Sequence, residues 1–148
     1  MKRGRRVDAL TVVAGLRGLR QASAAAAAGA AVRATRDADM RVKDGEDALE
    51  RVGAGFAQHL GASSRFDPQL AGAWATAWQA QQALVVSRCS DFSAACASES
   101  ARRAEWNVQL ALETAASEQL RRAKRLHARE RDDRLLADLA EQAGKARR

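Results

Sequence analysis

"GASSRFDP", residues 61–68, separates two long segments that favour helix. Gly61 can adopt the left-handed conformation that closes a helix. Asp67 followed by Pro68 is a favourable pair of N-cap and first-turn residues for opening the next helix. The stretch is therefore predicted to be a turn over residues 61–67 that connects two helices.

The composition predicts an all-α fold. The 148 residues include one proline, no tyrosine, three phenylalanines and three tryptophans, which are few large side chains for a thick core. Alanine, leucine, arginine and glutamine are strong helix formers, and β-branched residues never alternate as a strand requires. We expect a single coiled-coil domain in which helices over about residues 5–60 and 68–146 form an antiparallel hairpin, because the connection is short.

The second predicted helix has a heptad pattern with alternating spacings of four and three, typical of a coiled-coil seam. The pattern weakens at Glu99, Arg103 and Glu113. Cys89 and Cys96 lie on this seam, two turns apart, and are predicted to be buried packing residues without a disulfide or a metal. Unpaired thiols suit a reducing compartment. The predicted seam is Trp78, Gln82, Val85, Cys89, Phe92, Cys96, Glu99, Arg103, Trp106, Leu110, Glu113, Ser117 and Leu120.

The first predicted helix has a weaker seam with a shift of phase in the middle. Its many glycines each cost about 0.5–1 kcal/mol relative to alanine in a helix interior, so it is expected to depend on packing against the second helix. The predicted seam is Val12, Leu16, Leu19, Ser23 and Ala26, followed after the shift by Val42, Gly45, Leu49, Val52 and Phe56.

A turn centred near residue 64 sets the register between the two helices. It places Phe56 near Trp74 and Leu49 near Trp78. These two tryptophans and Trp106 are all predicted to be core residues. Residues after about 121 then have no partner in the chain and form an overhang of roughly 25 residues, or ~40 Å. Side-chain ion pairs stabilise such a single helix only weakly.

Basic residues gather at the two ends of the chain. The net charge of +7 suits an anionic partner, although a mixed-charge helix is also an ordinary solvated face. An acidic protein surface and phosphates both remain open, but aromatic residues for base stacking are absent from the basic segment. The candidate partner-binding residues are Arg121, Arg122, Lys124, Arg125, Arg129, Arg131, Arg134, Lys2, Arg3, Arg5 and Arg6.

The sequence contains no set of residues that suggests catalysis. His59 and His127 would lie almost at opposite ends of the hairpin, and a two-helix arrangement has no place to enclose a substrate. We therefore expect no enzymatic activity, cofactor, metal or small-molecule substrate. The basic N-terminus is not followed by a clean apolar segment, because Asp8, Arg17 and Arg20 interrupt it, so neither an export signal nor a membrane-spanning segment is expected.

The chain resembles FliJ-type proteins, which are stalk proteins of flagellar and virulence type III secretion export machinery. The resemblance runs over nearly the full length. Its most suggestive segments are "VDALTVVAGLRGLRQASAAAA" near the start and "AEWNVQLALETAASEQLRRAKRLHARERDDRLLADLAEQAGKARR" at the end. The second contains Trp106 followed by a basic stretch and then by "ADLAEQA", and it looks like the terminal helix of the family.

The resemblance implies a cytoplasmic stalk, peripheral to the membrane export apparatus, that inserts into the ring of the hexameric export ATPase. It also implies contact with the cytoplasmic domain of the export gate and, in some members, with export chaperones. By position, residues 121–134 and the basic N-terminus would face the ATPase. The alternatives are a basic coiled-coil protein associated with nucleic acid and a structural hairpin that binds chaperones. A second copy pairing along the second helix also remains open.

Overall fold

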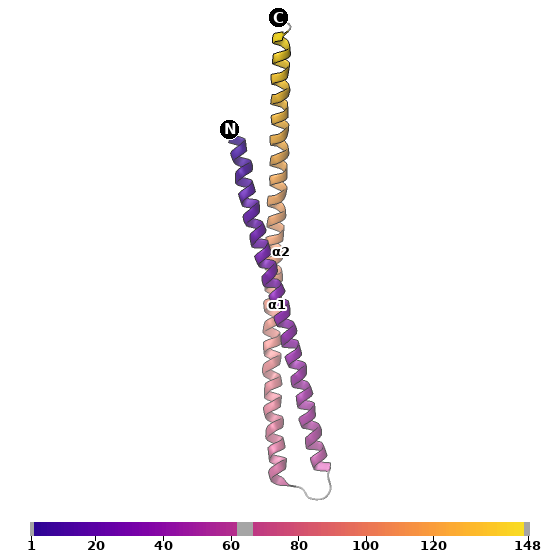
Figure 1. Cartoon of the computed structure of the whole chain (residues 1–148). Coiled ribbons are helices and arrows are strands. Elements are labelled where there is room, and N and C mark those ends of the chain that lie inside the picture. Colours follow the sequence, from indigo (N-terminus) through magenta and orange to yellow (C-terminus); the bar gives the residue numbers. More distant parts are fainter. Residues whose placement is uncertain (1, 62–66, 147–148) are drawn as a thin grey trace. The chain divides into compact units, whose positions relative to one another are not determined.

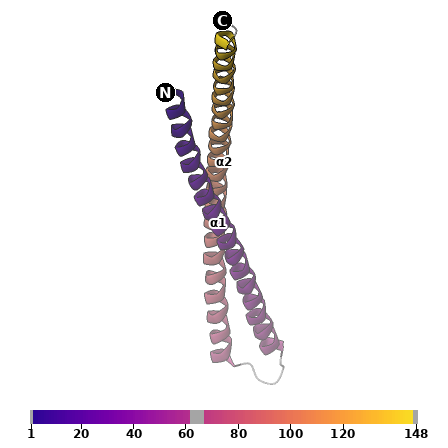
Figure 2. The ribbon, with the colours of Figure 1, turned by 45° about the horizontal axis from the view of Figure 1, so that its top comes forward.

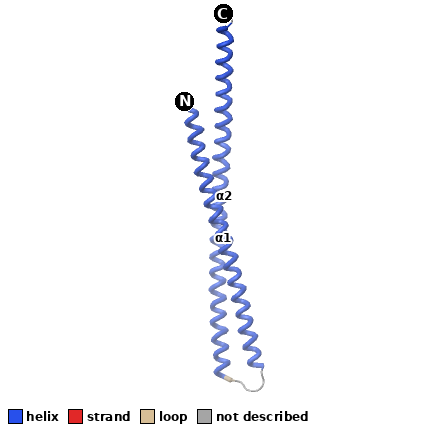
Figure 3. Tube along the Cα trace, viewed as in Figure 1, coloured by secondary structure: helices blue, strands red, loops and turns tan. Residues whose placement is uncertain are grey.

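The computed structural model describes residues 2–61 and 67–146. Helix α1 runs from Lys2–Gly61 and helix α2 from Pro68–Ala146 (Figure 1). Both are continuous, and the described residues contain no strand (Figure 3). The predicted all-α class with two long helices is confirmed.

The start of α2 forms as the sequence predicts. The carboxylate Oδ1 of Asp67 accepts hydrogen bonds from the backbone N–H groups of Gln69 at 2.9 Å and Leu70 at 3.3 Å. These are the bonds of an N-cap, which satisfy amides that have no partner inside the helix. The prediction for Gly61 was wrong, because it ends α1 without a left-handed φ. The rest of the predicted turn, residues 62–66, lies outside the described residues.

The two helices contribute to two separate units. The turn unit comprises Ala26–Arg103, and the terminal unit comprises Met1–Ala25 with Ala104–Arg148. In the turn unit the segments of α1 and α2 run antiparallel and side by side (Figures 1 and 2). In the terminal unit α2 continues beyond the first turn of α1 (Figure 1).

Two tryptophans of the turn unit pack against glycines. A Cβ atom at Gly53 would lie 2.5 Å from the ring of Trp78, and one at Gly55 would lie 2.6 Å from the ring of Trp74. A side chain at either position would therefore force the tryptophan ring to shift. Trp74 was predicted to lie near Phe56 and packs against the adjacent residue, Gly55. Trp78 was predicted to lie near Leu49 and packs against Gly53, one helical turn further along α1. Both tryptophans are half-buried.

Polar residues of α2 hydrogen-bond to the backbone of α1 in the same unit. The Nε2 of Gln81 donates to the carbonyl of Gly45 at 3.1 Å, and the Nη1 of Arg88 donates to the carbonyl of Arg41 at 2.8 Å. Gly45 itself is buried, and a Cβ there would lie 2.9 Å from the Arg88 guanidinium. These polar side chains can lie within the seam because they reach the backbone of α1 directly.

The predicted seam on α2 is confirmed in part. Within each unit, the predicted positions at Trp78, Val85, Phe92 and their heptad equivalents are less exposed than their neighbours. Most of the intervening positions were wrong by one residue, because they follow at a spacing of three instead of four, whereas the predicted Ser117 is half-buried. The half-buried residues there include Gln81, Arg88, Ala95, Gln109 and Ala116, whereas the predicted Gln82, Cys89, Cys96, Arg103 and Leu110 are exposed.

The two cysteines show why the phase was misjudged. Cys89 and Cys96 are free and exposed, which corrects the prediction that they pack inside. The seam positions beside them hold Arg88 and Ala95, a charged and a small residue. Because the apolar pattern favoured the cysteines, a spacing of four residues was predicted where the structure has a spacing of three.

The seam on α1 has no shift of phase. In the turn unit the predicted positions from Val42 to Phe56 are buried or half-buried. In the terminal unit the prediction was wrong, because Val12, Leu16 and Leu19 are 61%, 55% and 70% exposed. Ser23 is exposed as well, and so is Ala26 at the start of the turn unit. The half-buried or buried residues there include Val7, Leu10, Ala14, Arg17, Gln21 and Ala24.

The buried apolar residues among those described are all alanines, Ala24 in the terminal unit and Ala28 and Ala38 in the turn unit. No large side chain of the described residues is fully buried. Glu99 occupies a seam position and pairs with Arg103 of the same helix at 2.7 Å, which accounts for the polar interruption of the heptads. Packing between α1 and α2 therefore rests on small residues and on close approach.

Candidate partner-binding site

A groove lies between α1 and α2 in the terminal unit. It encloses about 650 Å³ and combines apolar side chains with charged ones. Val7, Leu10, Ala123 and Leu126 supply apolar surface, and Leu126 is 59% exposed. The other lining residues are Arg6, Gln119, Arg122, His127 and Glu130.

The local sequence explains this mixture. Val7 and Leu10 occupy the half-buried seam of α1, and Ala123 occupies the seam of α2. Alanine is too short to fill the space opposite two larger side chains. Arg6 and Arg122 flank these positions with long aliphatic stems and charged ends. The result is apolar surface bordered by cations.

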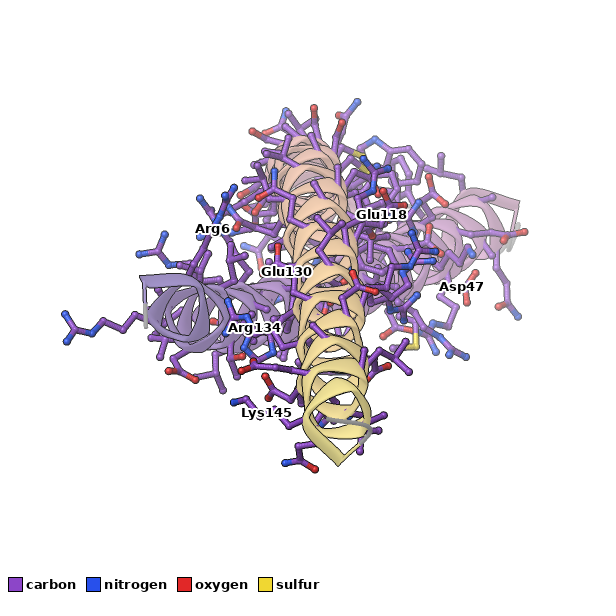
Figure 4. The ribbon with its side chains drawn as sticks, turned by 90° about the horizontal axis from the view of Figure 1, so that it is seen from above. Arg6, Asp47, Glu118, Glu130, Arg134 and Lys145 are labelled. Carbon is purple, nitrogen blue, oxygen red and sulfur yellow. The ribbon has the colours of Figure 1, made fainter. Side chains whose placement is uncertain are left out.

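The structure brings together the two predicted basic clusters, which are far apart in sequence. Arg6 from the N-terminal cluster and Arg122 from the C-terminal cluster line the same groove. Figure 4 shows Arg6 beside the start of α1, Glu130 and Arg134 on the side of α2 toward α1, and Glu118 on the opposite side. The remaining predicted residues with described side chains are all exposed: Arg5, Arg121, Lys124, Arg125, Arg129, Arg131 and Arg134. The side chains of Lys2 and Arg3 lie outside the described residues.

Some of these cations have local ion pairs. Arg122 lies 3.6 Å from Glu118, and Arg131 lies 3.4 Å from Asp132. All four side chains are more than half exposed, so solvent screens both pairs and each contributes little to stability. A partner carboxylate could replace either acidic residue at small cost.

The overhang is shorter than predicted. Residues after 121 were expected to have no partner, but Arg6, Val7 and Leu10 share the groove with residues as far as Glu130. All three residues of α1 already belonged to the predicted helix over about residues 5–60, so the difference lies in which residues of α2 they face. Residues 131–146 extend beyond the groove, and Leu135, Leu136 and Leu139 are 55–65% exposed there.

The apolar part of the groove was missed at the sequence level. Val7, Leu10, Ala123 and Leu126 were not among the predicted site residues, although the seam with spacings of three and four runs through the first three of them. Trp106, predicted to be core, is half-buried in the same unit, and its indole nitrogen is buried without a hydrogen-bond partner among the described residues.

The arrangement suits recognition of a protein segment that presents both an apolar side chain and a carboxylate. No helix in the described part of the chain has an apolar stretch long enough to cross a membrane. Comparison with known proteins found no matching family model, no matching curated protein and no matching solved structure.

Proposed function

We propose that this chain is a non-enzymatic, cytoplasmic stalk protein of FliJ type, which binds a hexameric export ATPase and couples it to the export gate. The observation that carries the proposal is the groove of the terminal unit, where Arg6 and Arg122 border apolar residues. The sequence resemblance, the two long helices and the exposed helix beyond residue 130 support it.

The same groove favours a protein over a nucleic acid as the partner. Nonspecific binding of single-stranded nucleic acid relies on aromatic stacking as well as on cations. Trp106 is the one aromatic residue among the described residues of the terminal unit, and it is half-buried. Exposed leucines such as Leu126 instead suit an apolar protein contact.

The test measures ATP hydrolysis by the purified hexameric export ATPase of the same organism during titration with the chain. We expect the full chain to bind and to raise the rate. The double variant R6E/R122E and the single variant L126E should each weaken binding about tenfold or more, because they alter the charge or the apolar surface of the groove. R51E and L84E are matched controls on exposed residues of the turn unit and should bind normally.

A chain that ends after Glu130 separates the groove from the exposed helix beyond it. Retained binding would locate the contact at the groove, whereas lost binding would locate it on residues 131–146. If the full chain fails to bind the ATPase at moderate salt, the proposal is wrong. Titration with duplex DNA at about 50 and 200 mM salt then tests the alternative, because phosphate binding weakens steeply over that range.

A further inference from the structure

Helix α1 carries a second apolar stripe, on the side away from α2. It starts at Ala9 and continues at alternating spacings of three and four, and every position of it is exposed. Outward positions of a heptad are ordinarily charged or polar, so an uncharged run of this length is unusual. We call this the outer stripe: Ala9, Val12, Leu16, Leu19, Ser23, Ala26 and Ala30.

The outer stripe is divided by size. Val12, Leu16 and Leu19 form its first part and are 55–70% exposed. Ser23, Ala26 and Ala30 form its second part. A helix with apolar residues on two opposite faces is expected to lie between two partners. In this molecule α2 covers only one of those faces.

We propose that a second copy of this chain covers the outer stripe, with the two α1 helices antiparallel and related by a twofold axis at Gln21. This inference does not depend on the proposed function. In this register the large residues of one copy meet the small residues of the other: Leu19 faces Ser23, Leu16 faces Ala26, and Val12 faces Ala30. The interface is therefore complementary to itself, as a twofold dimer requires.

The charges beyond the stripe agree with the same register. Arg5 of one copy meets Asp37 of the other, and along one edge of the seam Asp8 meets Arg36, each pair occurring twice by symmetry. All four residues are exposed and so are available for an external contact. A parallel pairing would instead place Arg5 on Arg5 and Asp37 on Asp37, which is unfavourable.

Two glycines of α1 fit the same symmetry. Gly15 lies six residues before Gln21 and Gly29 lies eight residues after it, so across the two copies they adjoin each other along the same edge of the seam as Asp8 and Arg36. A Cβ atom at Gly15 would meet nothing within 4 Å in the single chain, so packing against α2 does not require a glycine there. Close approach of two α1 helices would require one. The uncharged pairing extends from Val12 to Ala30; beyond it Ala9 faces Arg33, and Arg5 faces Asp37 at each end.

The first experiment measures the mass of the full chain in solution by sedimentation. We expect a dimer, and we expect L16E and L19E each to raise its dissociation constant about tenfold or more, because each places a charge in the interface. Both leucines are exposed, so the hairpin should still fold, which circular dichroism checks. V86E is the matched control, since Val86 is 65% exposed in the turn unit and lies off the stripe.

Charge variants test the orientation. D8R alone should weaken the dimer, and D8R/R36D should restore it, an outcome that damage to the fold would not produce. R20Q should strengthen the dimer, because the Arg20 side chains of the two copies lie near each other at the axis. A chain that stays monomeric at about 100 µM would overturn the proposal. So would a dimer that L16E and L19E leave unchanged, since a different surface would then mediate it.

Cross-linking tests the register. In a chain with both cysteines replaced by serine, A22C should be joined to its copy by a short bis-maleimide, because Ala22 adjoins the axis. A30C should not be, because the two copies of residue 30 would lie ~27 Å apart along the helices. Joining at both positions would indicate a parallel dimer, and joining at neither would indicate another register. Either result would overturn the proposed arrangement.

Discussion

Gly53 and Gly55 show at the scale of single residues how a helix-weakening residue can be required. Each leaves space for an indole ring from α2, so that Trp78 and Trp74 approach the backbone of α1 directly. The sequence alone suggests only the cost of glycine in a helix. The contacts in the structure show that burial of aromatic surface compensates for this cost.

Replacement of Gly53 by alanine should therefore destabilise the chain, although alanine favours helix. The added methyl group would overlap the ring of Trp78, and overpacking of this kind costs about 1–3 kcal/mol. Gly72 is the matched control, because a Cβ there meets nothing within 4 Å, and G72A should stabilise by about 0.5–1 kcal/mol. Urea unfolding at fixed protein concentration measures both. Equal stabilisation by the two substitutions would contradict the tryptophan contact.

Lys43 offers a test of local electrostatics. A hydrogen bond and the negative charge of Asp39, at 2.6 Å, raise the pKa of Lys43 above its ordinary value. Since a raised pKa favours the folded state until the pH passes through it, any contribution to stability is lost only at alkaline pH. D39N should lower the pKa of Lys43, as followed by NMR of the side-chain methylene groups. An unchanged pKa would show that the pair does not persist in solution.

The packing of the two helices depends on which positions form the seam as much as on their composition. Half-buried positions of α2 follow one regular alternation of three and four within each unit, and they include arginine, glutamine, glutamate and alanine. A seam of this kind is hard to see in a sequence, because nearby exposed positions hold more apolar residues. The structure identifies it from close packing around small residues.

Neighbouring alanines test this phase. Ala95 is half-buried on the seam and Ala94 is exposed beside it. A95E should lower the free energy of unfolding by about 1–3 kcal/mol, because it brings a carboxylate against α1. A94E should change it by less than about 0.5 kcal/mol. Thermal unfolding followed by circular dichroism measures the pair, and the reverse order would contradict a seam that runs through Ala95.

The sequence was sufficient to predict the two helices, but it did not predict which face of each helix packs against the other. Asp67 and Pro68 marked the start of α2, and the glycine and proline content marked the division between the helices. Two of the basic residues named from the sequence, Arg6 and Arg122, line the groove. The groove was not, because its apolar surface depends on which residues of α1 and α2 face each other, and Val7 and Leu10 contact α2 on a face opposite to the predicted one.

The whole molecule exposes much of its surface to solvent. Its accessible area is 11327 Å², and the buried apolar residues among those described are three alanines. Because few apolar side chains of the described residues are buried, the stability of the chain should respond strongly to partners that cover more of them. Comparisons of variants therefore need a constant protein concentration.

Truncation should show where the folded hairpin ends. Removal of the residues after Glu130 should leave the free energy of unfolding nearly unchanged, because the helix beyond that point has no partner in the terminal unit among the described residues. Removal of all residues after Leu120 should lower it by about 1–2 kcal/mol, since it takes away the contacts of Ala123 and Leu126. Denaturant titration compares the two. Equal stability would mean that the groove contributes nothing to folding.

Cys89 and Cys96 supply a pair of native labelling points. Both thiols are free and exposed, on one face of α2, and two turns separate them by ~10.5 Å along the axis. A bifunctional dye attached to both would be fixed parallel to the helix. Polarised fluorescence from that dye would report the orientation and rotation of α2 when the chain is bound to a larger assembly, without any engineered cysteine.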